Sequence, residues 1–262
     1  MKAIDLNCDL GEGIGIAKSG GDAAIFPLIS SANIACGFHA GDPQVMRDSV
    51  SLAVRHGVSI GAHPGTHDVK GFGRLAMNLS TEELENLLLY QIGALDAFAR
   101  AAGGQIRHIK PHGWLYNEAA KNANFAQVIA STVRSLNPEW ILFGAAGSQL
   151  IAAAKAVRLP FAEEAFADRT YEIDGSLTPR SQPGSLITDP VQASRQCLDI
   201  VLKGKLKTAS GAEISLHADT ICVHGDNPSA LTILRHIREA LSRNGFQIQA
   251  LSGGPSSTRP DD

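Results

Sequence analysis

Polar residues recur at every second position along three short apolar runs of the chain. Side chains of a β-strand point alternately to its two faces, so each run would send one polar row to a single side of a sheet. Burying that many ionisable groups is costly, which favours a working site over an ordinary core. The polar members are Asp5, Asn7 and Asp9 in the first run, His108, Lys110 and His112 in the second, and Cys222, His224 and Asp226 in the third.

Further polar residues lie in or just after other predicted strands. Active sites of parallel α/β proteins lie at the carboxyl ends of the strands, so we expect these side chains to converge there. One histidine in such a place is more often a hydrogen-bonded core residue, but several together favour an acid–base site. The additional residues are Asn33 in the second strand and His39 after it, His63 at the end of the third, and Glu163 and Glu164 in the sixth.

The same residues offer ligands for a divalent metal. Carboxylates and imidazoles suit Zn, Mn or Fe, and Asp9, His63 and His112 are singled out from the candidates Asp5, Asp9, His39, His63, His112, His224 and Asp226. No HxH or HExxH spacing sharpens this hypothesis, so catalysis with or without a metal stays open. The chain also lacks a GxSxG nucleophile elbow and a Walker-type phosphate loop.

Short apolar runs alternate with helical patterns throughout, which predicts an α/β fold with a parallel sheet. Seven strand units suggest a distorted seven-stranded (β/α) barrel, with an open doubly wound sheet as the alternative. Ser80 and Asp42 are expected to cap two of the helices. The predicted strands are Ala3–Cys8, Ala32–Cys36, Ser59–Ala62, Ile106–Ile109, Trp140–Gly144, Phe161–Phe166 and Thr220–Val223. The predicted helices are Pro43–His56, Thr81–Ala102, Asn124–Leu136, Gly147–Val157, Pro190–Leu202 and Asn227–Asn244.

No composition shift divides the chain, so we expect one barrel domain over residues 1–251 and a disordered tail over 252–262. Two segments interrupt the alternation. Residues 205–216 are expected to form an inserted β-hairpin, and the long loop 168–189 is expected to cover the site.

The composition narrows the class of protein. The net charge of -3 and the absence of a basic cluster argue against nucleic-acid binding. The N-terminus does not read as a signal peptide and no apolar run is long enough to span a bilayer, so we expect a cytoplasmic protein without a membrane partner. The four widely spaced cysteines, which form no CxxC pair, are expected to be reduced core residues.

Long motifs at the predicted strand ends resemble the LamB/YcsF family, in the family's order and over about residues 5–251. Together they make the resemblance specific. The motifs are DLNCDLGEG (5–13), SSANIACGFHAGDP (30–43), GAHPG (61–65), GFGR (71–74), IKPHGWLYN (109–117), FADRTYEIDGSLTPR (166–180) and ICVHGDNP (221–228).

The resemblance implies a distorted seven-stranded (β/α) barrel similar to polysaccharide deacetylases and glycoside hydrolases. It also implies ATP-dependent opening of 5-oxo-L-proline, or a related small lactam, to L-glutamate with release of ADP and phosphate. The enzyme would be a 5-oxoprolinase, a hydrolase of cyclic amide bonds that works with two other subunits. ATP would be a co-substrate, and a requirement for a divalent metal such as Mg stays open.

Site roles follow from the resemblance together with the strand-end pattern. The shared polar residues of the family also include Asp42. We assign catalysis to Asp5, Asp9, His39, His63, Lys110, His112 and His224. We assign substrate or phosphate binding to Asn7, Glu12, Asn33, Arg74, Asp168, Arg169, Arg180 and Asp226.

A five-membered lactam is a stable amide, so its opening needs charge balance for a transferring phosphoryl group and a base to activate water. Lys110 is the preferred cation, and His112 or His39 the preferred base, oriented by Asp9 or Asp5. Two other functions stay open: a metal-dependent amide hydrolase or deacetylase that needs no ATP, and a lactam-binding subunit without catalysis of its own. Departures from the family pattern near the site, which leave substrate preference open, are Thr66, His67, Leu75 and Trp114.

Overall fold

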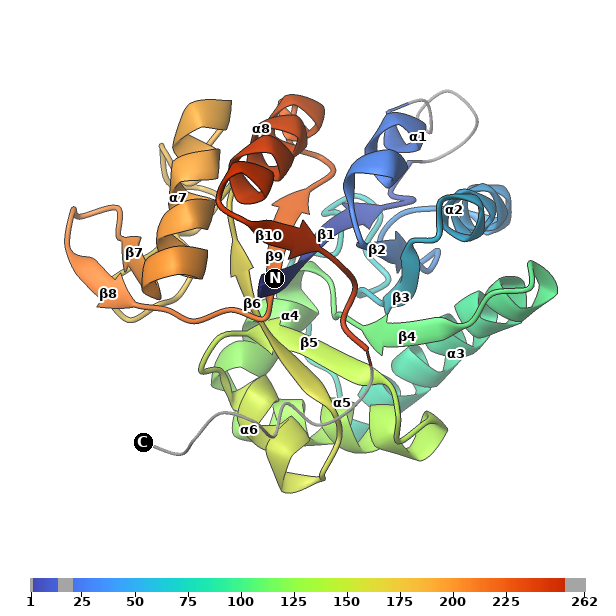
Figure 1. Cartoon of the computed structure of the whole chain (residues 1–262). Coiled ribbons are helices and arrows are strands. Elements are labelled where there is room, and N and C mark those ends of the chain that lie inside the picture. The colour runs from blue at the N-terminus through green and yellow to red at the C-terminus, as the bar shows by residue number, and fades with distance from the viewer. Residues whose placement is uncertain (1, 14–20, 253–262) are drawn as a thin grey trace.

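A computed structural model describes residues 2–13 and 21–252, and seven parallel strands in it close into a barrel (Figure 1). Closure comes from the pairing of the first strand with the last, from Asp5 opposite Thr220 to Asp9 opposite His224. The predicted barrel is therefore confirmed, and an open sheet is excluded. The barrel strands are β1 (Lys2–Leu10), β2 (Ser31–Ala35), β3 (Ser59–His63), β4 (Ile106–Ile109), β5 (Ile141–Ala145), β6 (Phe161–Phe166) and β9 (Thr220–His224).

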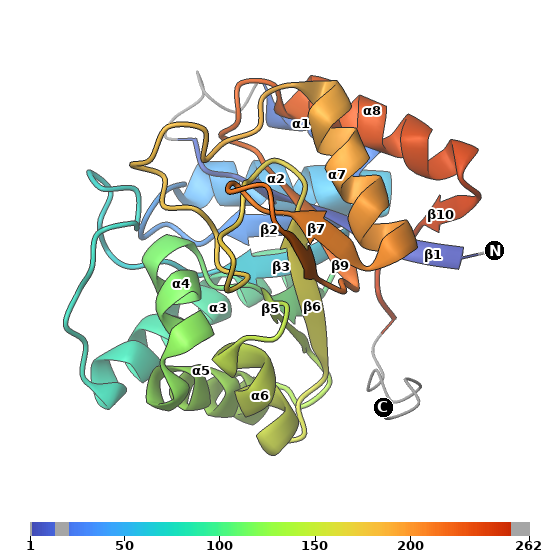
Figure 2. The ribbon, with the colours of Figure 1, turned by 90° about the vertical axis from the view of Figure 1, so that its left-hand side faces the viewer.

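Helices surround the barrel, and six of them lie where the sequence predicts them (Figure 2). Ser80 forms a capping box with Glu83, and Asp42 accepts hydrogen bonds from the backbone N–H groups of Gln44 and Val45, as expected from their positions. Within the described residues, no helix is long and apolar enough to cross a membrane. The six helices are α2 (Pro43–His56), α3 (Thr81–Ala101), α5 (Ala123–Leu136), α6 (Gln149–Ala156), α7 (Pro190–Lys203) and α8 (Ala230–Arg243).

Several elements were not predicted. The helix α4 (Gly113–Lys121) follows directly on His112, and its buried residues include Tyr116. A short strand, β10 (Phe246–Ile248), pairs in parallel with the start of β1 outside the closed barrel. The remaining additions are α1 (Asp22–Ile25) and the short 3-10 helix η1 (Phe26–Leu28).

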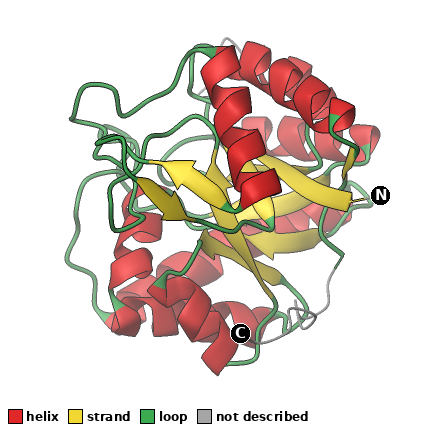
Figure 3. Ribbon diagram, turned by 60° about the vertical axis from the view of Figure 1, so that its left-hand side comes forward, coloured by secondary structure: helices red, strands yellow, loops and turns green. Residues whose placement is uncertain are grey.

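The two interruptions of the alternation form ordered features (Figure 3). The antiparallel strands β7 (Lys205–Lys207) and β8 (Glu213–Ser215) lie in the segment expected to form a hairpin. The loop 168–189 is held by two isolated bridges, Arg169–Leu186 and Tyr171–Leu177. The expected disordered tail, except Ser252, lies outside the described residues. All four cysteines are buried and unpaired, as expected.

Polar side chains fill the barrel interior in layers. In the lowest layer, the Asp5 carboxylate accepts hydrogen bonds from the hydroxyls of Ser30, Ser31 and Thr220 at 2.5–2.7 Å. Above it, His108 stacks on Phe143 with ring centroids 4.2 Å apart. These layers supply partners for buried polar groups, which would otherwise destabilise the barrel.

Gly61 of β3 leaves room for the His108 ring, since a Cβ atom there would lie 2.0 Å from Nε2. We expect Gly61→Ala to lower the free energy of unfolding by about 1–3 kcal/mol because the buried ring cannot yield without strain. Gly93, in the middle of α3, has nothing within 4 Å of such a Cβ, so Gly93→Ala is the matched control and should stabilise slightly. Denaturant unfolding of both variants tests this, and equal effects would contradict it.

Candidate active site at the mouth of the barrel

The buried ammonium of Lys110, directly after β4, lies at the centre of the polar interior. Its Nζ is 2.8 Å from Asp9 Oδ1, 3.0 Å from Glu164 Oε1 and 3.1 Å from Cys222 Sγ. Burial disfavours the charged amine, but the two carboxylates outweigh it and hold the pKa of Lys110 well above its usual value. Lys110 is therefore a permanent cation shared by strands β1, β6 and β9.

Two predicted site residues connect this centre to the layer below. Asn33 donates to Asn7 Oδ1 at 2.7 Å and to Asp9 Oδ1 at 2.8 Å, and its own carbonyl oxygen faces His108 Nε2 at 2.8 Å. Asn7 donates to Glu164 Oε1 at 2.9 Å. Both amides are fully buried and fix the two carboxylates on either side of Lys110.

Asp5 belongs to the lowest layer and is not among the residues that line the cavity described below. Burial raises the pKa of Asp5, with its three hydroxyl contacts acting in the opposite direction. Its surroundings suit support of the barrel base, while its assignment to catalysis stays a prediction.

A second cluster joins three of the predicted histidines to Glu12. The rings of His39 and His112 stack with centroids 3.7 Å apart, and His112 Nδ1 lies 2.9 Å from His63 Nε2. Glu12 Oε1 lies 3.3 Å from His39 Nε2 and 3.2 Å from His112 Nδ1. His63 Nε2 is also 3.4 Å from Asp9 Oδ2, so this cluster borders the Lys110 centre.

The charges in this cluster are set by burial and by the neighbouring groups. Burial lowers the pKa of His39 to about 3, so this ring is neutral near pH 7. Burial also acts against the charged form of His63, but Asp9 outweighs it and raises the pKa. Burial acts likewise against the charged form of Glu12, yet the contacts with His112 and His39 hold the pKa of that carboxyl below its usual range.

A further predicted histidine, His224 at the end of β9, forms a separate pair with Asp168. Its Nδ1 is 2.9 Å from Asp168 Oδ1, and Asn227 donates to the other oxygen of the carboxylate at 3.0 Å. Burial would raise the pKa of Asp168, but His224 and Asn227 hold it below its usual value. A carboxylate can only accept, so Nδ1 carries the proton and the neutral ring keeps its lone pair on Nε2.

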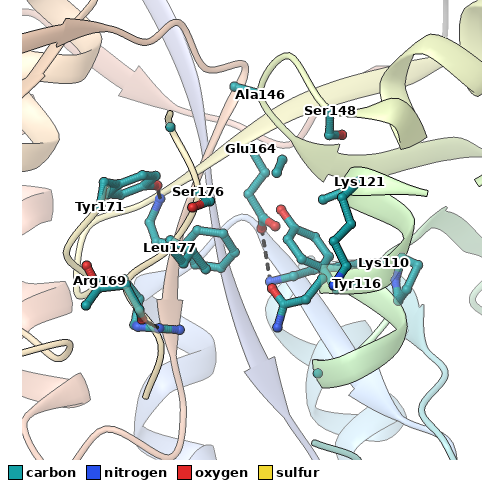
Figure 4. A pocket seen from close by; sticks show the side chains of 18 of the residues that line it. Lys110, Tyr116, Lys121, Ala146, Ser148, Glu164, Arg169, Tyr171, Ser176 and Leu177 are labelled. Carbon is teal, nitrogen blue, oxygen red and sulfur yellow. Dashed lines mark hydrogen bonds and ion pairs between the residues drawn. The ribbon is translucent and has the colours of Figure 1, made fainter. Parts of the chain in front are cut away.

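An open cavity of about 630 Å³ leads from the mouth down to Lys110 (Figure 4). Its walls include Asp9, His63, His112 and His224, together with the loop that was expected to cover the site. That loop contributes Arg169, whose guanidinium donates to the carbonyls of Ser185 and Thr178. Burial, with Arg180 nearby, lowers the pKa of Arg169 to about 10.

Asp226 joins two arginines at the rim. It forms ion pairs with Arg74, from the loop after β3, and with Arg180, from the loop after β6. Both arginines line the cavity, so the rim is positive on the side where three loops meet. Asp42 lies elsewhere, as the cap of α2.

Two cavity residues were not assigned to the site from sequence. Glu164 is 1% exposed and its Oε2 has no hydrogen-bond partner within the described structure. The hydroxyl of Tyr116 on α4 is also buried and lies beside the Glu164 carboxylate, without a hydrogen bond of good geometry there. Burial and the nearby Glu164 carboxylate raise the pKa of Tyr116 well above its usual value, so the hydroxyl keeps its proton. The sequence signal for Glu164 was its place in the sixth strand, where Glu163 and Glu164 were both expected to converge on the site without an assigned role.

Comparison with known proteins establishes the family. The model of the LamB/YcsF family matches residues 4–255. The chain belongs to the LamB/YcsF family. Among its relatives, the A subunit of 5-oxoprolinase from Bordetella parapertussis is 52% identical over 95% of this chain and 98% of its own length. The protein of the same name from Tolumonas auensis is 51% identical over 96% of this chain and 100% of its own.

Solved structures agree with this assignment. The crystal structure of a lactam utilization protein from Thermus thermophilus matches this LamB/YcsF chain with a TM-score of 0.89 and 46% identity, covering 96% of this chain and all of the other. A GH113 β-1,4-mannanase matches with a TM-score of 0.52 at 10% identity over 92% of this chain and 99% of its own, which shows a shared fold only.

Removal of the central cation should destabilise the protein strongly. We expect Lys110→Met to lower the free energy of unfolding at pH 7 by about 3–5 kcal/mol, because Asp9 and Glu164 are left buried without their counter-charge. Lys121→Met, at an exposed cavity residue, is the control and should change stability little.

The pH dependence of that loss follows from the carboxylates. Burial raises the pKa of Asp9, but His63 and Lys110 outweigh it and lower it far below its usual value, so its contribution to stability is present above about pH 4 and is lost as pH falls further. Without Lys110 the two acids should protonate more readily, so the gap between variant and wild type should narrow on acidification. A gap that stays constant between about pH 7 and pH 4 would contradict the account.

Proposed function

We propose that this protein is a hydrolase subunit that opens the ring of 5-oxo-L-proline to L-glutamate, coupled to hydrolysis of ATP to ADP and phosphate. It would act in the cytoplasm together with the other subunits of a 5-oxoprolinase. The proposal is supported by relatives about half identical over nearly the whole chain that are named as the A subunit of 5-oxoprolinase. That name supports a multi-subunit enzyme with a lactam substrate.

The observation that carries the proposal is a pair of unmatched polar atoms beside the buried cation. A lactam presents an N–H donor and a carbonyl acceptor on one edge of its ring. Glu164 Oε2 is a buried acceptor and the Tyr116 hydroxyl a buried donor beside it, and neither makes a hydrogen bond of good geometry within the described structure. We infer that the lactam N–H donates to Glu164, while its carbonyl faces Tyr116 and Lys110. Such polar groups select a substrate strongly because an analogue leaves them unpaired.

The chemistry that this arrangement must support has three steps. The lactam oxygen attacks the γ-phosphorus of ATP, ADP leaves, and the ring N–H proton passes to a base. Water then adds to the ring carbon, and the C–N bond breaks as the nitrogen takes up a proton, which gives a γ-glutamyl phosphate. A second water hydrolyses this acyl phosphate to glutamate and phosphate.

Positively charged side chains for the phosphoryl group lie at two depths in the cavity. Lys110 lies at the floor of the cavity, and Arg74, Arg169 and Arg180 lie at or near its rim. Fixed cations of this kind stabilise charge on transferring phosphoryl oxygens. A divalent ion such as Mg²⁺ that accompanies ATP would add to them.

We assign activation of water to His224. The expected base was His112 or His39 with Asp9 or Asp5 as its orienting acid, and these two rings instead contact Glu12. His224 lines the cavity, and Asp168 holds its Nδ1 proton so that Nε2 can accept one. Asp168 is a positioning residue in this scheme.

The first experiment is an assay of glutamate release from 5-oxo-L-proline, with the purified chain alone and with its partner subunits, with and without ATP. We expect turnover only when ATP and the partners are both present. Cleavage of a lactam or acetyl amide without ATP, abolished by a chelator, would favour a metal-dependent amide hydrolase instead. Binding of lactam with turnover that is unaffected by His224→Asn and Glu164→Gln would favour a non-catalytic binding subunit.

Substitution of the lactam-binding pair should affect the chemistry selectively. We expect Glu164→Gln and Tyr116→Phe each to lower kcat/KM for 5-oxo-L-proline by about 10–100-fold, since each removes one hydrogen bond to a buried polar group. Tyr90→Phe, at an exposed tyrosine of α3, should leave the assay unchanged. Full activity of both site variants would contradict the proposed position of the substrate.

Loss of the acid that orients His224 should lower kcat rather than binding. We expect Asp168→Asn to reduce kcat by about 10³–10⁴-fold with KM little changed, because the ring would take the wrong tautomer. The pH profile of kcat should also change, which a purely structural role of Asp168 would not produce. Asp226→Asn, at the rim, is the comparison and should act mainly on KM.

A further inference from the structure

With the His63 and His112 rings neutral, as metal ligands must be, the cluster of Glu12, His63 and His112 brings together three atoms that can all only accept. His63 Nδ1 lies 2.7 Å from the Lys110 carbonyl oxygen, and His112 Nε2 lies 2.8 Å from the Phe72 carbonyl oxygen. A carbonyl oxygen has no proton to give, so the proton of each neutral ring is on the nitrogen that faces it. In the neutral rings the lone pairs are therefore on His63 Nε2 and His112 Nδ1.

These two lone-pair nitrogens face each other at 2.9 Å. Glu12 Oε1 is 3.2 Å from His112 Nδ1 and 3.8 Å from His63 Nε2, so a carboxylate oxygen completes a triangle of acceptors. One proton can lie between only two of the three atoms. A cation at the centre of the triangle satisfies all three.

The geometry points to a transition-metal ion, and we propose that Glu12, His63 and His112 bind one Zn²⁺ or a similar divalent ion. Tetrahedral ligands at about 2.0–2.2 Å from zinc lie roughly 3.3 Å from one another, which the three observed separations bracket. Two imidazoles and one carboxylate are a ligand set that zinc accepts, with a further position left for water or substrate. His63 and His112 both line the cavity, so an ion can enter from it.

The outer contacts of the ligands also match a metal site. Ligating histidines usually donate their second ring N–H to a carbonyl or carboxylate, as His63 and His112 do here. His39 Nε2 contacts Glu12 Oε1 at 3.3 Å and can hold this carboxylate toward the ion. The His39 ring stacks on His112 with an interplanar angle of 4°, which fixes the orientation of that ligand.

Glu12, rather than Asp9, supplies the carboxylate in this assignment. Asp9 Oδ1 already accepts from Lys110 and Asn33, and its charge is balanced by the ammonium. Glu12 contacts only histidines among the described residues. In the expected ligand set of Asp9, His63 and His112, Glu12 therefore replaces Asp9 as the carboxylate ligand. Asp9 lies beside the ion instead.

Metal uptake by the full chain tests this inference without reference to activity, so it can fail independently of the proposed function. The purified chain would be stripped with a chelator, then titrated with Zn²⁺ by calorimetry and with Co²⁺ by visible absorption. We expect one equivalent to bind, with a cobalt band typical of nitrogen and oxygen ligands. Glu12→Gln and His112→Asn should each weaken binding by more than about 100-fold, exceeding the loss usual for an outer-sphere contact.

Two further variants make the result decisive. His236→Gln removes a half-buried histidine of α8 far along the chain from the cluster and should leave binding unchanged, while Asp9→Asn should weaken it by less than Glu12→Gln does. Circular dichroism and thermal unfolding confirm that each variant is folded. Absence of stoichiometric uptake, uptake unaffected by Glu12→Gln and His112→Asn, or a larger loss with Asp9→Asn would each overturn the proposed site.

Discussion

The buried ion pairs of Lys110 are the interaction around which the barrel interior is arranged. An ammonium that is 2% exposed requires counter-charge within hydrogen-bond distance, and it has Asp9 from β1 and Glu164 from β6. These strands are neither neighbours of β4 nor of each other, so only the closed barrel brings the three groups together. The charge network therefore depends on closure, and closure in turn is stabilised by the network.

The remaining polar residues take their places around this centre. Asn7 and Asn33 fix the carboxylates from below, while the Glu12 cluster and the His224–Asp168 pair occupy two separate positions above. Because the Lys110 ammonium balances the charge of Asp9, the Glu12 carboxylate contacts only histidines among the described residues. Because one oxygen of Glu164 is held by Lys110 and Asn7, the carboxylate's other oxygen remains available to Tyr116 and to the cavity. One buried cation thus separates the wall formed by Glu164 and Tyr116 from the cluster of histidines around Glu12.

Much of this arrangement could be predicted from sequence, since the strand alternation identifies which side chains face the barrel interior. The alternation does not show how deep in the barrel a side chain lies. Asp5 shares the face of Asn7 and Asp9 yet lies in the lowest layer. In the sixth strand two adjacent glutamates point to opposite sides, and only pairing with β5 and β9 shows that Glu164 is the inner one. Tyr116 could not be predicted because its helix, α4, is short and packs its hydroxyl against a distant strand. The pairing of His224 with Asp168 likewise spans 56 residues and depends on the loop after β6.

The central claim is that a lactam binds beside Glu164 with its carbonyl toward Tyr116 and Lys110, and a crystal structure of the protein with 5-oxo-L-proline bound tests it most directly. The account predicts the ring N–H within hydrogen-bond distance of Glu164 Oε2, with the ring carbonyl directed toward Tyr116 and Lys110. It also predicts the ring carbon on the side of the cavity that His224 faces. A lactam bound at the arginine rim, with Glu164 and Tyr116 still unpaired, would contradict it.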